Sequence, residues 1–77
     1  MKVTLLAFAS AAQRLGWRMH EVEAEAATTP LELFERAHAG FLPGTARVAV
    51  NGNYHEWSAP IGPDAREIAI IPPVSGG

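Results

Sequence analysis

The chain has 77 residues, 48% of them hydrophobic, and a formal net charge of −2, so it forms one small domain with one core. It contains no cysteine, which excludes disulfides, cysteine-ligated zinc and a cysteine nucleophile and fits a reducing compartment. It has no basic cluster typical of nucleic-acid binding, no apolar run that could span a membrane and no signal-peptide pattern, so we expect a cytoplasmic protein that binds neither.

Residues 2–8 predict the first strand. Apolar side chains occur at both parities of this segment, which indicates a strand that is either buried on both faces or carries an exposed apolar patch. Val3 and Leu5 would point to one face, and Leu6 and Phe8 to the other.

A short helix is expected after this strand. Ser10 can cap a helix that runs to about Leu15, and Gly16 can end it in the left-handed conformation. Ala12 and Leu15 would then face inward.

Residues 20–25 alternate glutamate with small or apolar residues, which predicts an edge strand. Its carboxylates would point to water and discourage pairing with other chains. We therefore interpret the three acidic residues as a solvated face and not as a catalytic cluster; they are Glu21, Glu23 and Glu25.

The main helix has the clearest local signal. Thr29 is a helix N-cap, Pro30 suits the first helical position and Glu32 completes a capping box. The helix should run to about Ala39 and end at Gly40. Its single buried stripe, typical of a helix that lies across a sheet, consists of Leu33, Phe34 and Ala37.

A hairpin and a final strand follow. Asn51-Gly52 between two strand-like runs predicts a tight hairpin turn, because both turn positions need positive φ. Residues 58–65 predict a loop, and residues 66–71 the last strand. The first and last strands are the most apolar and should be central neighbours. The order of elements predicts an α+β fold of the β-grasp, ubiquitin-like type, a mixed sheet crossed by one main helix.

The end of the chain predicts an extended, flexible tail of residues 72–77 after a domain of residues 1–71. Pro72 and Pro73 lack the N–H that a sheet ladder requires, so the last strand should stop before them. Two glycines end the sequence and could enter a slot too narrow for any other residue. The tail is either an arm, with a reach of at most roughly 20 Å, that presents the carboxylate of Gly77, or an ordinary frayed end.

Other candidate residues favour structural roles. The three histidines occupy different predicted elements without ligand spacing, so we expect no metal site; they are His20, His38 and His55. His38 is expected to be half-buried beside the helix stripe. Tyr54 and Trp57 are expected to be core or edge-of-core aromatics, although either could stack on a ligand.

Four segments together resemble one known family. They are Met1-Lys2-Val3-Thr4 closing in Phe8-Ala9, Arg14-Leu15-Gly16, Val48-Ala49-Val50-Asn51-Gly52 with Tyr54 and Trp57, and Ile70-Ile71-Pro72-Pro73-Val74-Ser75-Gly76-Gly77. With them the sequence resembles the small, sulfur-carrying subunit of molybdopterin synthase over nearly its whole length. The thiamine-pathway carrier shares the fold and the Gly-Gly end but usually lacks the paired prolines. The turn at residues 62–65 departs from the family pattern, without affecting the arm.

The resemblance implies that the chemistry belongs to the C-terminus. A ubiquitin-activating-like adenylyltransferase would use ATP and magnesium to adenylate the carboxylate of Gly77, next to Gly76. A sulfur donor would displace AMP and leave a thiocarboxylate. The tail would deliver this sulfur in the large catalytic subunit of a heterotetrameric synthase, where a cyclic pterin precursor becomes the molybdopterin dithiolene. The chain itself would be non-catalytic and bind no cofactor or metal.

The alternatives are a carrier for a related sulfur pathway (thiamine, cysteine or a tungsten cofactor), a ubiquitin-like modifier of lysines, and a docking domain with an inert tail. We expect the activating enzyme and the large synthase subunit to dock in turn on the outer sheet face beside the tail. The expected partner contacts are Leu6, Phe8, Ile71, Pro72, Pro73, Val74 and Ser75. Alternatively, the loop of residues 58–65 could cover this face and make it core.

Overall fold

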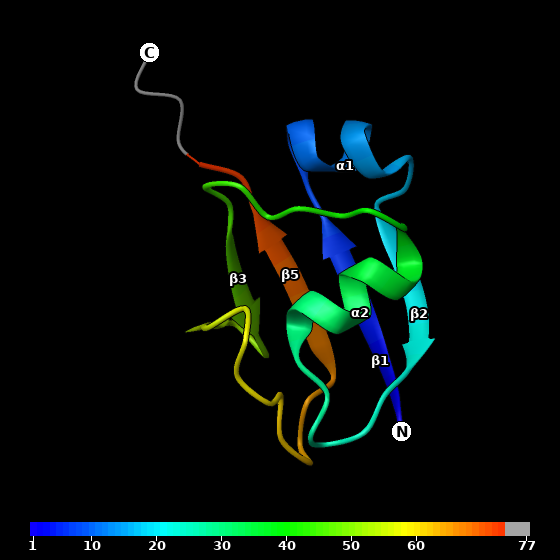
Figure 1. Cartoon of the computed structure of the whole chain (residues 1–77), viewed down its shortest axis with the longest axis vertical. Helices are drawn as coiled ribbons and strands as arrows, with labels where there is room; N and C mark the ends of the chain where they lie inside the picture. The colour runs from blue at the N-terminus through cyan, green and yellow to red at the C-terminus, as the bar shows by residue number, and fades with distance from the viewer. Residues whose placement is uncertain (74–77) are drawn as a thin grey trace.

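Five strands form one mixed sheet in the computed structural model, which describes residues 1–73 (Figure 1). The strand order is β2-β1-β5-β3-β4. The elements in chain order are β1 (Lys2–Ala7), α1 (Ala9–Leu15), β2 (Met19–Glu23), α2 (Pro30–Ala37), β3 (Arg47–Val50), β4 (Asn53–His55) and β5 (Glu67–Ile71). The first and last strands are parallel neighbours inside the sheet, as predicted, and α2 lies across one face. This is the β-grasp fold.

The core lies between α2 and the inner face of the sheet. Alternate residues of the central strands point into it, because side chains of a strand alternate between the two faces. Those that are 0 or 1% exposed are Val3, Leu5, Ala7, Val48, Ile68 and Ile70, together with Leu33 and Phe34 of α2. The two parities predicted for the first and last strands are therefore confirmed.

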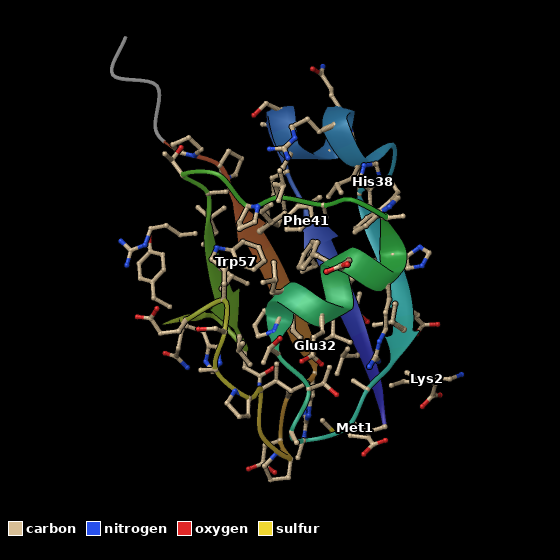
Figure 2. All side chains as sticks on the ribbon, in the orientation of Figure 1. Met1, Lys2, Glu32, His38, Phe41 and Trp57 are labelled. Carbon is tan, nitrogen blue, oxygen red and sulfur yellow. The ribbon has the colours of Figure 1, made fainter. Side chains whose placement is uncertain are left out.

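Phe34 is the centre of an aromatic cluster beneath α2. Its ring centroid lies 6.1 Å from that of Trp17, 5.2 Å from that of Phe41 and 5.6 Å from that of Trp57. Figure 2 shows Phe41 and Trp57 beside the helix. The indole N–H of Trp57 donates to the carbonyl of Ala46 at 2.9 Å, so this half-buried residue satisfies its polar group at the edge of the core, as predicted.

The start of α2 is as predicted, but its end is not. The Thr29 hydroxyl oxygen accepts the backbone N–H of Glu32 at 3.2 Å, and Pro30 occupies the first turn. The helix stops at Ala37, before the predicted end near Ala39. His38 takes an extended conformation and is exposed, which corrects the prediction of a half-buried side chain. The backbone leaves the helix at this residue and carries the imidazole out of the apolar stripe.

The predicted cap of α1 is wrong. The helix begins at Ala9, its N-cap position is Phe8, and no side chain caps it, so Ser10 lies in the first turn. Ala9 has a φ of 48°, a left-handed conformation that turns the chain sharply out of β1. This turn changes which residues face the core: Ala11 and Leu15 are buried, while Ala12 is only half-buried. Gly16 ends the helix at a φ of 85°, as predicted.

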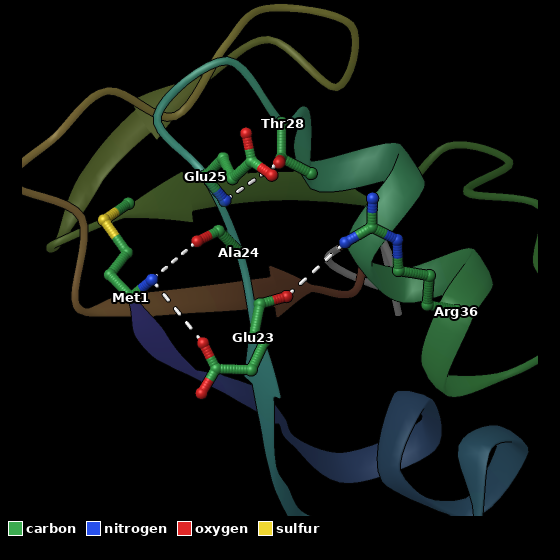
Figure 3. Close-up of polar contacts among 6 residues, drawn as sticks. All are labelled: Met1, Glu23, Ala24, Glu25, Thr28 and Arg36. Carbon is green, nitrogen blue, oxygen red and sulfur yellow. Dashed lines mark hydrogen bonds and ion pairs between the residues drawn. The ribbon is translucent and has the colours of Figure 1, made fainter.

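The edge strand β2 is held at its end by contacts with the start of β1 (Figure 3). The ammonium group of Met1 donates to the carbonyl of Ala24 at 2.8 Å and lies 3.5 Å from the carboxylate of Glu23. Arg36 donates to the carbonyl of Glu23 at 3.4 Å. The three glutamates of this segment are exposed, which confirms the predicted solvated face.

Asn51 fastens the hairpin turn to the start of β5. Asn51 and Gly52 have φ values of 51° and 84°, which confirms the predicted turn. The side-chain oxygen of Asn51 accepts the backbone N–H of Arg66 at 2.8 Å and that of Glu67 at 3.1 Å. Its side-chain amide donates to the carbonyl of Asp64 at 2.8 Å. One side chain therefore joins two segments far apart in the sequence.

We predict that Asn51→Ala lowers the free energy of unfolding by about 2–4 kcal/mol. The substitution removes three hydrogen bonds, each worth about 1 kcal/mol. It also places alanine at a positive φ, without the local hydrogen bonds that favour asparagine in this conformation. Urea denaturation measures the change. Asn53→Ala, at an exposed position of the neighbouring strand, is the control, and equal stability of both variants would contradict this role for Asn51.

Candidate functional site

The outer face of the sheet, opposite α2, carries an apolar row that crosses all the strands. Register partners connect Met19 to Leu6, Leu6 to Ala69, Ala69 to Ala49, and Ala49 to Tyr54. Each strand therefore contributes one residue at the same height. We call these five residues the apolar row. They lie on the face opposite the core because they alternate with the inward-pointing residues of the same strands.

Tyr54 differs from its prediction and closes one end of this row. The side chain is 64% exposed, whereas we predicted a core or edge-of-core aromatic. The short edge strand β4 places it on the open face. The guanidinium carbon of Arg47 lies 4.0 Å from the centroid of the tyrosine ring, a cation–π contact that covers one face of the ring.

Two further apolar residues, Phe8 and Ile71, lie where β1 and β5 end. Phe8 follows β1 directly, keeps an extended backbone and is 53% exposed. Ile71 ends β5, is half-buried and is the register partner of Arg47. The parallel register of Ala7 with Ile70 places Phe8 and Ile71 at the same end of the sheet, next to Pro72.

The last strand leads from the middle of the sheet to the two prolines. β5 ends at Ile71, as predicted; Pro72 is half-buried and Pro73 exposed. The missing N–H of proline accounts for the end of the ladder. Residues 74–77 lie outside the described part of the chain. The roles assigned to Val74, Ser75, Gly76 and Gly77 therefore stay predictions, as do the partner contacts proposed for Leu6, Phe8, Ile71 and the prolines.

The loop of residues 58–65 packs on the helix side of the sheet. Ile61 and Ala65 are buried in the main core. The backbone N–H groups of Ile61 and Gly62 donate to the carbonyls of Thr28 and Ala26, each at 2.9 Å, in the segment before α2. The alternative in which this loop covers the outer face is therefore wrong. Within the apolar row, Met19 and Tyr54 are exposed, Leu6 and Ala69 are half-buried, and Ala49 is buried.

The structure adds residues that the sequence did not assign to the site. Met19 is 64% exposed at one end of the apolar row, and Tyr54 with Arg47 lies at the other. Alternation within β2 and β4 shows which residues of each strand share a face with Met19 and with Tyr54. Their position in one row with Leu6 depends on strand register, which the sequence leaves open.

The histidines occupy three separate environments. The ring of His20 lies 5.2 Å from that of Trp17, His38 follows the end of α2, and Nε2 of His55 lies 3.1 Å from the carbonyl of Ala59. Among residues 1–73, no three histidine, aspartate or glutamate side chains gather where they could hold a metal ion. In the same range, no helix is long and apolar enough to cross a membrane.

We predict opposite effects for two apolar substitutions on β1 and its exit. Phe8→Ala truncates an exposed side chain and should leave the melting temperature nearly unchanged, while weakening partner binding by about 1–4 kcal/mol. Val3→Ala opens the core at a position that is 1% exposed and should lower stability by about 1–3 kcal/mol without a specific effect on binding. Thermal unfolding and binding titrations measure both. If Phe8→Ala unfolds the domain, Phe8 is core and the docking face lies elsewhere.

Comparison with known proteins agrees with this geometry. The structure is similar to that of SAMP1 from Haloferax volcanii, with a TM-score of 0.76 and 24% identity over 100% of both chains. It is also similar to a molybdopterin converting factor, subunit 1, from Pyrococcus furiosus, with a TM-score of 0.68 and 24% identity over 96% of this chain and 99% of that one. A second structure of H. volcanii small archaeal modifier protein 1 gives a TM-score of 0.72 and 23% identity over 95% and 98% of the two chains.

These structural similarities show a shared fold. Among curated protein sequences, none matches the chain. The ThiS family, by contrast, matches residues 5–77, which is nearly the whole sequence and includes the segment after β5. The chain therefore belongs to the ThiS family of small, ubiquitin-like sulfur carriers.

Proposed function

We propose that this protein is the sulfur carrier of molybdenum cofactor biosynthesis and that Gly77, as the terminal residue of the active chain, holds the sulfur. The observation that carries the proposal is the course of β5. This central strand crosses the apolar row at Ala69 and ends two residues later at Ile71, immediately before Pro72-Pro73-Val74-Ser75-Gly76-Gly77. A partner that docks on the row would therefore receive the C-terminal segment beside its docking surface.

The proposed reaction has two steps. A carboxylate oxygen of Gly77 attacks the α-phosphorus of ATP, and pyrophosphate leaves, so the acyl carbon now carries a good leaving group. Hydrosulfide would attack this carbon, AMP would leave, and the thiocarboxylate would form directly. With a persulfide donor the product would be an acyl disulfide, and a second thiol would release the thiocarboxylate by forming a disulfide with the donor sulfur. ATP and magnesium are bound by the activating enzyme in this scheme, which is an adenylyltransferase of the ubiquitin-activating type. Because activation consumes ATP, the proposal places it in the cytoplasm.

In the proposal the carrier contributes position and its partners contribute catalysis. The carrier has no cysteine, so no thiol of its own competes with the thiocarboxylate for acceptors. The large catalytic subunit of molybdopterin synthase would receive the tail and supply the groups that transfer sulfur to a cyclic pterin precursor. Both the activating enzyme and the large subunit would use the open face, so they would bind one after the other.

Two observations support molybdopterin synthesis over related sulfur pathways. The paired prolines before Val74-Ser75-Gly76-Gly77 are the feature in which the sequence resembles the small synthase subunit more than the thiamine carrier. The similar P. furiosus structure is described as a molybdopterin converting factor, subunit 1. The complete synthase would be a heterotetramer that contains this chain as its non-catalytic subunit.

A second candidate function is protein modification. It is favoured by the similarity to SAMP1, which is described as a small archaeal modifier protein. In this case a lysine amine of a target would attack the activated Gly77 carbonyl, AMP or a thiol would leave, and an amide would form. The same activated terminus serves both functions, so the acceptor decides between them.

Transfer from the purified thiocarboxylate form to different acceptors tests the proposal. The carrier is incubated in parallel with the large molybdopterin synthase subunit and its pterin precursor, with the thiamine-pathway acceptor enzyme, and with ATP, the activating enzyme and a lysine-rich protein. We expect rapid loss of sulfur and dithiolene formation only in the first reaction. Sulfur transfer to the thiamine-pathway acceptor, or amide conjugates without dithiolene formation, would contradict the molybdopterin assignment.

A further inference from the structure

The outer face carries opposite charges on the two sides of the apolar row. Arg47 lies two residues from Ala49, toward the end where β5 leaves the sheet. Glu67 lies two residues from Ala69, toward the other end, and is level with Thr4, whose partner on β2 is Glu21. All three charged side chains belong to exposed residues. The basic and acidic positions therefore lie at nearly equal distances, about 7 Å along the strands, from the row.

This arrangement is complementary to itself under a two-fold rotation. A rotation axis that runs along the apolar row would place the row of one copy against the row of another. It would also turn the arginine side of each copy toward the glutamate side of the other. After this rotation, Arg47 of one copy and Glu67 of the other lie at the same level along the strands. They are offset sideways by one strand spacing, about 4.8 Å, which an arginine and a glutamate side chain span easily.

We propose that two copies of this chain pair face to face through the apolar row, with Arg47 of each copy against Glu67 of the other. An isologous interface of this kind needs only one self-complementary patch. The other two-fold arrangement, with the axis along the strands, would bring Arg47 toward the same residue of its partner and the glutamates toward one another. Repulsion between like charges disfavours it. The proposal does not depend on the sulfur-carrier function.

The size of the face sets the strength of this dimer. Five strands spaced about 4.8 Å apart, over the three levels from Glu67 to Ile71, present roughly 400 Å² per copy. A stable complex buries about 800 Å² per partner, about twice this area, so we expect a weak dimer. A weak dimer would cover the apolar row when the protein is concentrated. A partner with a larger interface on the same face would displace the second copy.

Opposite charge variants, alone and mixed, test the pairing. Arg47→Glu alone and Glu67→Arg alone each place like charges at both contacts, so each should be monomeric where the unmodified chain dimerises. A mixture of the two variants places opposite charges at both contacts and should restore the dimer. Glu35→Arg, an equal charge change on the exposed side of α2, is the control and should dimerise like the unmodified chain. Thermal unfolding confirms that each variant is folded.

Sedimentation velocity and concentration-dependent NMR shifts provide the measurements. We expect concentration-dependent amide shifts at Leu6 and Ala69, absent at Leu33 of α2, and a sedimentation coefficient that rises with concentration. A monomer up to millimolar concentration would overturn the proposal. So would a dimer that both charge variants form as well as the unmodified chain, or a mixture that associates no better than each variant alone.

Discussion

Adding one alanine after Gly77 is expected to reduce thiocarboxylate formation at the native terminus by at least about 100-fold, the scale on which a misplaced reacting group loses rate. The extension converts the carboxylate of Gly77 into an amide, so ATP has no oxygen anion to react with at this residue. It also moves the new carboxylate about 3.5 Å farther from the docking face. The rate of pyrophosphate release with the activating enzyme measures the effect, and intact mass confirms that the added residue is retained.

Gly76→Val tests how side-chain size in the tail affects activation when the length of the tail is unchanged. The valine side chain adds a branched Cβ where we propose that the partner channel admits only glycine, so activation should fall to a similar extent while the fold is kept. Glu35→Gln, on the exposed side of α2, is the matched control and should react at the unmodified rate. Sulfur delivery by the extended chain, or activation of Gly76→Val at the control rate, would show that the terminal glycines have no special role.

Phe34→Ala is expected to lower the free energy of unfolding by about 3–5 kcal/mol, the largest stability loss for a single truncation in this core. The side chain is 0% exposed and lies among the rings of Trp17, Phe41 and Trp57, which would face the resulting cavity. A domain of this length has a total stability of roughly 4–12 kcal/mol, so this loss removes a quarter or more of it. Urea denaturation at low temperature gives the value.

Leu42→Ala is the control for this core substitution. The leucine is 72% exposed in the loop after α2, so its truncation should change stability by less than about 0.5 kcal/mol. Losses of similar size in the two variants would contradict the central place of Phe34 in the core. A small loss for Phe34→Ala alone would show that the aromatic cluster collapses around the cavity.

Local chemistry explains which elements could be predicted from the sequence. Thr29 and Pro30 define the start of α2, and Asn51-Gly52 defines the hairpin turn, because each signal acts within a few residues. Alternation in β1 and β5 likewise separates the inner from the outer face within each strand. These features are confirmed because short-range preference and long-range packing agree there.

The wrong predictions concern residues whose position depends on the rest of the fold. Ser10 has the chemistry of a cap, but the left-handed turn at Ala9 starts the helix before it. His38 lies where the helix ends early, and Tyr54 lies on an edge strand that exposes its outer face. The same limit applies to the candidate site. Leu6 and Phe8 were expected on the outer face, whereas the continuous row across the sheet follows only from the register of strands distant in the sequence.

The central claim is that Gly77 carries the sulfur. Its most direct test is tandem mass spectrometry of the chain after incubation with ATP, magnesium, the activating enzyme and a sulfur donor. The account predicts a mass gain equal to the exchange of one oxygen for sulfur, located on the C-terminal residue and absent when ATP is omitted. Sulfur found on any other residue, or an unchanged terminus under conditions in which the enzyme activates its known carrier, would contradict it.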